Sequence, residues 1–235
     1  TSEPTTRISM GVTLPGTDTE PDGTGVPRDL SIEYFDNLGT SQSINVTFTP
    51  TVPAAPPASN TWTMTMRDSA SGGGVIGEYT VVFDASRAAG GTIASVTQSP
   101  GAPGGAYDPS TGVLTVNVDS GPIDVNIGAV GTGAGLTQLS DNFAPTAISK
   151  DGSPVGNLIS VEVDENGFVH ANFDVGITRT VYQIPLIDLP NPNGLVADDN
   201  QLYSTSADSG SFFLWDAADG PTGDVVSNAL EESST

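Results

Sequence analysis

Apolar and polar residues alternate in short segments along most of the chain, and a period of two is the pattern of half-buried β-strands. In residues 5–14 the alternation puts four apolar side chains on one face: Ile8, Met10, Val12 and Leu14. In residues 60–68, Trp62 and two methionines share one face, while three threonines share the other. Because aromatic and β-branched residues fit a pleated, half-buried surface, we predict a strand in each segment.

Further strands are predicted at residues 31–35, 43–48, 78–84, 91–98, 112–118, 123–127, 161–163, 168–173, 178–189, 201–204, 212–215 and 224–229. Two pairs of these strands are joined by turns that suit a β-hairpin. The first turn contains Asp36 and Gly39, and the second contains Asn166 and Gly167, which tolerate positive φ. The first part of the chain has no convincing helix, whereas residues 230–235 are expected to begin one.

The composition supports an all-β fold. Glycine (28) and proline (18) make up about a fifth of the 235 residues, which argues against long helices. Hydrophobic residues reach 36% and charged residues only 14%, so the chain can bury a core while much of its surface is uncharged Thr, Ser and Asn. The length suits one large β-domain or two ordinary ones, and we predict two β-domains with little helix.

The net charge of −22 comes from 28 acidic and 6 basic residues. Such a charge repels phosphate backbones and anionic membrane surfaces, so nucleic-acid partners are excluded. No run approaches the roughly 20 apolar residues of a membrane span, and we predict no membrane insertion. The sequence contains no cysteine, which excludes disulfides, thiolate nucleophiles and zinc-cysteine sites.

The residues that could carry catalysis form no recognisable pattern. His170 is the only histidine, so a Ser-His-Asp relay would depend on it, but a surface position on a strand explains it better. A glycosidase needs two carboxylates that face one cleft, and no spacing selects such a pair. The candidates are Glu33, Glu78, Glu162 and Glu165. We therefore predict no enzyme activity, no catalytic residue, no cofactor and no small-molecule ligand.

Three turns are rich in Asp and Asn, and clustered oxygen ligands attract hard cations such as calcium. They lie at residues 108–112, 164–167 and 198–200. None completes the ligand spacing of an EF-hand, so turn formation explains them and no metal site is predicted. One alternative stays open, an extracellular adhesin or a carbohydrate- or calcium-binding β-sandwich that would use these turns with Trp62 or Trp215.

A series of motifs carries more information than the isolated residues. Residues 32–40 read IEYFDNLGT and precede Asn60 and Trp62, and LTQL follows at 136–139. The later motifs are KDGSPVGNL at 150–158, VEVDENGFV at 161–169, YQIPLIDLPNPNGL at 182–195, NQLY at 200–203, SG at 209–210 and LEESS at 230–234. In this order they resemble the motifs of axial flagellar proteins. The block with Asn60 and Trp62 favours the bacterial flagellar hook family over the distal-rod proteins.

The resemblance implies an outer hook β-domain at residues 1–144 and the C-terminal half of the inner β-domain at residues 145–235. The family's terminal helices, which drive polymerisation, are expected to be missing here. The implied function is that of a structural subunit, located outside the cell in the flagellar hook and basal body. Its copies polymerise helically into a curved tube that acts as a universal joint for motility. The implied partners are further copies and the rod, hook-cap and hook-filament junction proteins.

The resemblance also marks residues that are expected to maintain the structure or to contact neighbouring subunits. They are Asp36, Gly39, Trp62, Asp151, Gly152, Gly167, Gly176, Asn191, Pro192, Gly194, Leu195, Ser209, Gly210, Leu230 and Glu231.

Overall fold

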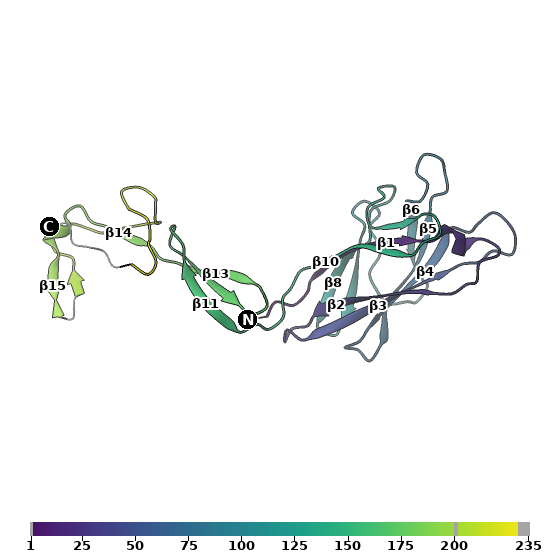
Figure 1. Cartoon of the computed structure of the whole chain (residues 1–235), viewed down its shortest axis with the longest axis horizontal. Helices are drawn as coiled ribbons and strands as arrows, with labels where there is room; N and C mark the ends of the chain where they lie inside the picture. Colours follow the sequence, from purple (N-terminus) through teal and green to yellow (C-terminus); the bar gives the residue numbers. More distant parts are fainter. Residues whose placement is uncertain (1, 200–201, 230–235) are drawn as a thin grey trace. The chain divides into compact units, whose positions relative to one another are not determined.

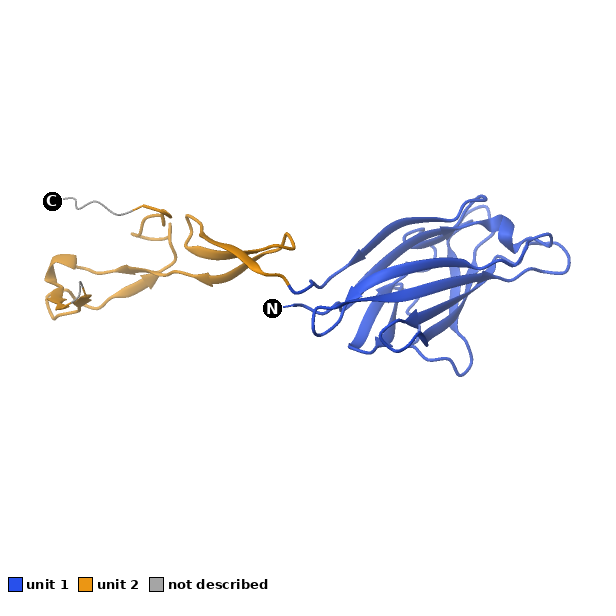
Figure 2. Ribbon diagram, turned by 60° about the horizontal axis from the view of Figure 1, so that its bottom comes forward, with its two compact units in different colours: residues 1–155 blue, residues 156–235 orange. Residues whose placement is uncertain are grey.

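The computed structural model describes residues 2–199 and 202–229 of the chain. These residues form β-strands, loops and two short 3-10 turns, which confirms the predicted all-β fold (Figure 1). The chain divides into two compact units, Thr1–Val155 and Gly156–Thr235 (Figure 2).

The first unit contains an antiparallel five-stranded sheet in which each strand pairs with the next one along the chain. Its strands are β2 (Arg28–Phe35), β3 (Ser41–Pro50), β4 (Thr61–Asp68), β5 (Gly74–Phe83) and β6 (Ile93–Gln98). The alternation seen in the sequence sets the two faces of this sheet. On β4, Trp62, Met64 and Met66 are fully buried, and the threonines between them lie on the opposite face.

The second sheet of this unit has the strand order β10-β1-β8-β7, and β9 also pairs with β1. The bounds are β1 (Arg7–Leu14), β7 (Val113–Val118), β8 (Gly121–Asn126), β9 (Leu136–Gln138) and β10 (Ala144–Lys150). β1 pairs with β10 in the antiparallel sense, and with β8 and β9 in the parallel sense. The first strand of the chain is therefore fixed by segments that come much later in the sequence.

One apolar core lies between the two sheets. The cluster of buried side chains draws on strands of both sheets, and its largest members include Trp62, Tyr34, Tyr79 and Phe48. Burying a large apolar side chain completely contributes about 1.5–3 kcal/mol to folding. Side-chain burial between two facing sheets is thus the main source of stability in the first unit.

The sequence pattern does not predict β10, and the first unit extends beyond the predicted domain boundary between residues 144 and 145. The five central residues of β10 are all exposed, so the strand has no apolar alternation that could reveal it. Its backbone pairs with β1 from Ala144 to Lys150 and thereby joins the first unit. The division between the compact units lies between Val155 and Gly156.

The described residues of the second unit form three small antiparallel sheets. The first is made of β11 (Leu158–Val163), β12 (Phe168–Phe173) and β13 (Thr178–Gln183). In the other two, β14 (Leu186–Asp188) pairs with β17 (Phe213–Trp215), and β15 (Val196–Asp198) pairs with β16 (Leu202–Ser204). The predicted hairpin across Asn166 and Gly167 is confirmed, because Val163 pairs with Val169.

Two expectations for the second unit are wrong. The single strand predicted at residues 178–189 is divided into β13 and β14 at Pro185, which has no N–H group to donate to a strand ladder. Residues 224–229 form no strand, although the Val225 N–H donates to the Glu165 carbonyl at 3.0 Å. The helix expected at residues 230–235 lies outside the described residues.

The second unit buries very few apolar side chains. Among its described residues, only Ala171 and Ala217 are both hydrophobic and buried. The most exposed large apolar side chains retain 65–69% of their accessible surface: Ile159, Tyr182, Tyr203 and Val226. Backbone pairing and turns, rather than a packed core, define the described structure of this unit.

Candidate functional site

The chain enters and leaves the main body of the first unit at the same place. Glu3 and Ser153 form an isolated antiparallel bridge, in which the Glu3 N–H donates to the Ser153 carbonyl at 3.2 Å and the Ser153 N–H donates back at 2.8 Å. The strands β1 and β10 continue inward from this bridge. We call this region the clasp and define it as residues 2–7, 33–41 and 150–155.

The Asp151 carboxylate fastens the two chain segments of the clasp together. It accepts hydrogen bonds from the Thr6 N–H at 2.7 Å, the Thr6 hydroxyl at 2.6 Å and the Arg7 N–H at 2.8 Å. Partial burial raises the pKa of Asp151, but these hydrogen bonds outweigh it and hold the pKa below its ordinary value. The carboxylate is therefore ionised at neutral pH and acts as a three-bond acceptor.

Gly152 allows the two segments to approach each other. Its φ is +87°, and a Cβ at this position would lie 2.9 Å from both the Glu3 carbonyl oxygen and the Thr5 amide nitrogen. The buried Thr5 hydroxyl donates to the Asp151 carbonyl at 3.0 Å and accepts from the Phe35 N–H at 3.0 Å. One threonine thus connects all three segments of the clasp, and Gly152 makes room for it.

The turn between β2 and β3 completes the clasp. The Asp36 carboxylate accepts from the N–H groups of Leu38 and Thr40, both at 2.9 Å, which lowers its pKa and closes the turn. Gly39 has a φ of +75°, and a Cβ there would lie only 2.8 Å from the Val155 amide nitrogen. Four of the predicted site residues, far apart in the sequence, therefore meet in the clasp: Asp36, Gly39, Asp151 and Gly152.

Lys150 provides the charged side of the clasp. Its Nζ lies 2.5 Å from Glu33 Oε2 and 4.6 Å from the centroid of the Phe35 ring. The hydrogen bond from Lys150 is the largest cause of the lowered pKa of Glu33, and a second bond from Ser41 adds to it. Glu33 lies at the surface, so this pair orients β10 against β2 and contributes little stability.

Trp62, another predicted site residue, anchors a polar contact inside the first unit. Its indole N–H donates to Gln138 Oε1 at 2.8 Å, and the Gln138 amide donates to Asn60 Oδ1 at 2.7 Å. Asn60 and Gln138 belong to two of the sequence motifs but were not among the predicted site residues. The contact links β4 to β9 and satisfies the one polar group of a fully buried indole.

Asp68 is a structural residue that the sequence analysis missed. It is fully buried and accepts from the Tyr34 hydroxyl at 2.7 Å, the Ser71 hydroxyl at 2.6 Å and the Asp119 N–H at 2.9 Å. Burial raises the pKa of Asp68, but the hydrogen bonds prevail and the pKa lies below its ordinary value. The signal was present, because the period of two places Asp68 on the same inward face as Trp62.

Four predicted site residues meet in the second unit, where residues 190–194 contact residues 206–210. Asn191 donates to the Asp208 carbonyl at 3.1 Å from its amide and to the Ser209 carbonyl at 3.3 Å from its backbone. Ser209 is fully buried, and a Cβ at Gly194 would lie 2.6 Å from its nitrogen. The predicted residues in this contact are Asn191, Gly194, Ser209 and Gly210. Pro192 and Leu195 lie in the adjoining 3-10 turn, where the Leu195 N–H donates to the Pro192 carbonyl at 3.2 Å.

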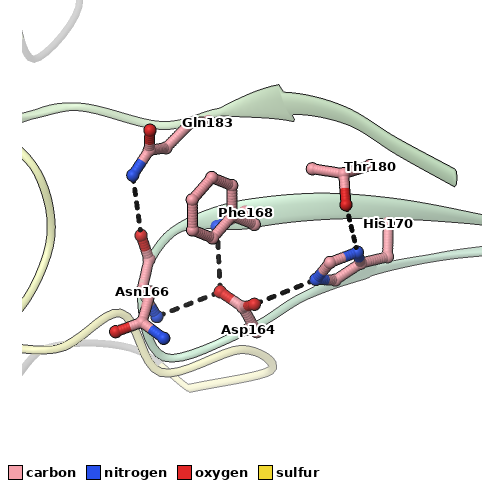
Figure 3. A network of polar contacts seen from close by, with 6 residues as sticks. All are labelled: Asp164, Asn166, Phe168, His170, Thr180 and Gln183. Carbon is pink, nitrogen blue, oxygen red and sulfur yellow. Dashed lines mark hydrogen bonds and ion pairs between the residues drawn. The ribbon is translucent and has the colours of Figure 1, made fainter.

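The two remaining described candidates, Gly167 and Gly176, close hairpin turns with φ values of +79° and +77°. Beside Gly167, the Asp164 carboxylate accepts from the N–H groups of Asn166 and Phe168 and lies 2.9 Å from His170 Nε2 (Figure 3). The bond to His170 is the largest cause of the lowered pKa of Asp164. Leu230 and Glu231 lie outside the described residues.

The site geometry shows no arrangement typical of catalysis or metal binding. Glu33 and Glu78 lie on β2 and β5, which are separated by two strands, and Glu162 pairs in register with His170. Within residues 2–199 and 202–229, no group of three or more His, Asp or Glu side chains could hold a metal ion. Nor does the described part contain a helix that is long and apolar enough to cross a membrane. The candidate residues instead close turns and join chain segments.

In a comparison with known protein families, residues 10–153 match the family model described as Flagellar basal body protein FlaE D2 domain. The match covers almost all of the first unit and ends at Ser153, the residue whose backbone closes the clasp with Glu3. The family model therefore coincides with the first compact unit and contains the motifs at residues 32–40, 60–62 and 136–139.

Several similar proteins are named Flagellar hook protein FlgE. The Caulobacter vibrioides protein is 30% identical over 125 residues, which cover 53% of this chain and 21% of that protein. The Brucella suis protein is 25% identical over 99% of this chain and 52% of its own length, and the Escherichia coli K12 protein is 25% identical over 97% and 54%. The chain thus spans about half the length of these last two relatives.

Comparison with solved structures gives the crystal structure of the Helicobacter pylori flagellar hook protein FlgE2. The superposition covers 81% of this chain and 39% of that chain, with 18% sequence identity and a TM-score of 0.47.

Proposed function

This chain belongs to the flagellar hook protein family, and on that premise we propose that it is part of a structural subunit that polymerises into the flagellar hook. The observation that carries the proposal is the FlaE D2 domain match over residues 10–153, supported by hook proteins that align with 97–99% of the chain. The subunits form a curved tube that joins the motor to the filament and bends while it turns.

In this proposal the first unit is the outer hook domain and the clasp is its attachment. Both chain segments leave through the clasp side by side, and Asp151 fastens one to the other through Thr6 and Arg7. Torsion on such an attachment is shared by two backbones, because rotation about one is opposed by the other. This property suits a subunit that transmits torque.

The second unit, in turn, is the C-terminal half of an inner domain. Its first sheet has one apolar face, since Val161 pairs with Ala171 and Val163 pairs with Val169. Val161 keeps 55% of its surface exposed, and neighbouring apolar side chains are exposed as well. An apolar sheet face of this kind needs a second layer. We assign that layer to another part of the full-length subunit.

The proposal replaces two other functions that the sequence brought into consideration, an enzyme and an adhesin or ligand-binding β-sandwich. The relatives are named as flagellar hook proteins and none of these names describes an enzyme, so we assign no catalytic role to this chain. The comparisons give no support to the adhesin or carbohydrate-binding alternative. The proposed partners are further copies of the subunit and the rod, hook-cap and hook-filament junction proteins.

Immunogold electron microscopy tests this proposal. Antibody raised against the 235-residue chain is applied to hook-basal bodies purified from the source organism. We expect gold along the short curved segment, and none when the antibody is first absorbed with the purified chain. Gold on the cell wall, or no flagellar labelling with an antibody that recognises the denatured subunit, would contradict the proposal.

Hydroxyl-radical footprinting tests the assignment of the second unit. Tyr182 and Tyr203 are 65% and 67% exposed in the isolated chain and should be modified readily there. If another part of the subunit covers this unit, both tyrosines should be protected in assembled hooks, whereas Tyr34, already fully buried, should change little. Equal modification in the chain and in hooks would contradict the assignment.

A further inference from the structure

Four threonines stand in one row across the outer face of the five-stranded sheet. Thr49 on β3 pairs in register with Thr63 on β4. Thr63 pairs with Thr80 on β5, and Thr80 pairs with Thr97 on β6. In the adjacent row, Thr47 pairs with Thr65. We call this surface the threonine face and define it by six residues: Thr47, Thr49, Thr63, Thr65, Thr80 and Thr97.

The side chains of the four-residue row lie at the surface of the sheet, where Thr97 is exposed and the other three are half-buried. Their strand neighbours Phe48, Trp62 and Val81 are fully buried, so the threonines point away from the core. In the described part of the chain, the row takes part in no side-chain hydrogen bond. By contrast, Thr47 donates to Asp29 at 2.8 Å, and Thr65 lies 3.5 Å from Glu78.

The charge distribution indicates what kind of partner fits this face. The first unit has 15 acidic and 5 basic residues, a net charge of −10, so two copies repel each other wherever carboxylates meet. The row itself contains no charged residue, and the adjacent Asp29 and Glu78 are turned toward Thr47 and Thr65. A copy of the same acidic chain can therefore come closer to this uncharged row than to parts of the unit where carboxylates meet, although Asp29 and Glu78 lie beside the row.

We propose that the threonine face is the surface through which the first unit contacts the first unit of a second copy of this chain. The inference rests on the proposed function, which requires copies to pack against one another. Threonine suits the contact because its β-branched side chain is stiff and loses little rotamer freedom when a neighbour covers it. Each threonine also offers a methyl group for packing and a hydroxyl group for exchangeable hydrogen bonds.

The regular spacing of the face also permits sliding. Neighbouring strands are about 4.8 Å apart, so the four threonines of the row recur at this spacing across the sheet. A neighbour that moves by one strand along the row meets a threonine again, whereas a neighbour that moves along β5 meets Glu78 in place of Thr80. The contact therefore has several registers of similar energy along the row, and copies can shift in that direction while they remain in contact, as a bending tube requires.

Site-specific crosslinking tests the contact. The chain contains no cysteine, so a maleimide label attaches only to the introduced cysteine. The variants Thr63→Cys and Thr80→Cys, and the control Ser9→Cys on the other sheet, are labelled with a benzophenone maleimide. They are irradiated at high protein concentration, in salt that shortens the Debye length to roughly 4 Å. We expect the two threonine-face variants to give about tenfold more crosslinked dimer than Ser9→Cys, equivalent to about 1.4 kcal/mol of preference.

The crosslinked peptides show what covers the face. Several neighbouring attachment points within residues 1–155 of the second copy are expected for a sliding contact. Equal dimer yields from all three variants would overturn the proposal, and so would the absence of dimer from Thr63→Cys and Thr80→Cys. Attachment to the second unit of the other copy would overturn it as well.

Charge variants provide an independent test on the full chain. Thr49→Glu with Thr80→Glu places two negative charges on the face with one strand between them, and should lower the dimer yield about tenfold at moderate salt. Ser9→Glu with Asn117→Glu adds the same charge to exposed positions of the other sheet, also with one strand between them, and should leave the yield unchanged. Circular dichroism verifies that each variant is folded. An equal loss in both double variants would overturn the proposal.

The crosslinking experiment and the immunogold experiment can fail independently of each other. Hook labelling without a threonine-face crosslink leaves the proposed function standing and overturns this contact. A specific crosslink without hook labelling supports the contact between copies and contradicts the hook assignment.

Discussion

The two units share their secondary structure but differ in what stabilises it. Both consist of short strands with clear apolar alternation, yet the first unit buries an apolar core between two sheets, whereas Ala171 and Ala217 are the only buried hydrophobic residues among those described in the second. The alternation of apolar and polar residues along a strand shows which face of the sheet must be buried by a second layer. A second layer within the same compact unit provides that cover in the first unit, and the described part of the second unit has none.

The comparison extends to electrostatics. The first unit has 15 acidic and 5 basic residues, while the second has 13 acidic residues and one arginine in only 80 residues. Charge repulsion within the second unit is therefore stronger per residue, and little apolar burial opposes it. We expect the second unit to be the first part of the isolated chain to lose structure.

Hydrogen exchange should show the largest difference between the units. Amides in the core strands β3 and β4 exchange only on global opening, while those in β11 and β15 exchange on local opening. With an ordinary global stability, exchange should be at least about a thousandfold slower in the core strands. Mass spectrometry of peptides from the exchanged chain measures both. Equal protection of the two units would contradict the comparison.

The two tryptophans allow a matched substitution in each unit. Trp62 is fully buried and hydrogen-bonded, whereas Trp215 is 38% exposed. Trp62→Ala should lower the free energy of unfolding of the first unit by about 3–5 kcal/mol. Trp215→Ala should cost no more than about 1 kcal/mol, because fewer contacts are lost. Urea unfolding followed by circular dichroism measures both, and similar costs would contradict the difference in packing.

Two glycines with similar φ allow two causes of destabilisation by a Gly→Ala substitution to be measured separately. These causes are the close approach of neighbouring atoms and the positive φ itself. Gly152→Ala, in the clasp, adds a Cβ within 3.0 Å of backbone atoms, whereas Gly176→Ala, in the second unit, adds one in open space. Gly176→Ala should cost about 1 kcal/mol from positive φ alone. Gly152→Ala should cost about 1–3 kcal/mol more and speed exchange of the Thr6 and Arg7 amides. An unchanged exchange rate at these two amides would show that the clasp tolerates the methyl group.

Asp68 should make the first unit sensitive to acid. Its pKa in the folded state lies below the unfolded value of about 3.9, so its contribution is complete above that pH and is lost as the pH falls through the folded pKa. Asp68→Asn should cost about 1–3 kcal/mol at pH 7 and reduce the loss of stability between about pH 4 and pH 2. Asp141→Asn, an exposed control, should change neither. If Asp68→Asn loses as much unfolding free energy between about pH 4 and pH 2 as the original chain, the acid sensitivity does not come from Asp68.

Much of the fold was predictable from the sequence because most strands of the first unit have one buried face. β1, β4 and β7 were found from their alternation, and the hairpin at Asn166 from its turn chemistry. β10 could not be found in this way, because its side chains are exposed and only its backbone pairing with β1 holds it. Pro185 is a sequence signal for the break between β13 and β14, because proline has no N–H group to donate. The β-branched residues around it nevertheless favoured the prediction of one continuous strand.

The sequence motifs selected several residues that meet in the structure, but they did not show how these residues meet. The motif resemblance selected Asp151 and Gly152, but nothing in their spacing shows that they meet Thr5 and Thr6 or the turn at Gly39. Such contacts depend on tertiary pairing between distant segments. Asn60 and Gln138 were missed as site residues for the same reason, since the two residues are far apart in the sequence and their hydrogen bond to each other and to the Trp62 indole forms only in the folded unit.

Because Glu3 and Ser153 form an antiparallel bridge, the two ends of the first unit lie as close together as the two ends of a single β-hairpin. To the residues before and after it, the whole domain is a long insertion whose ends lie beside each other, so its size can change without moving the flanking chain. Closing the gap would require only a short turn, because Glu3 and Ser153 already pair with each other. The cost of closing a loop grows slowly with its length, so a domain of another size would also fit at this point. The bridge is thus a natural point at which evolution or a designer can exchange one domain for another.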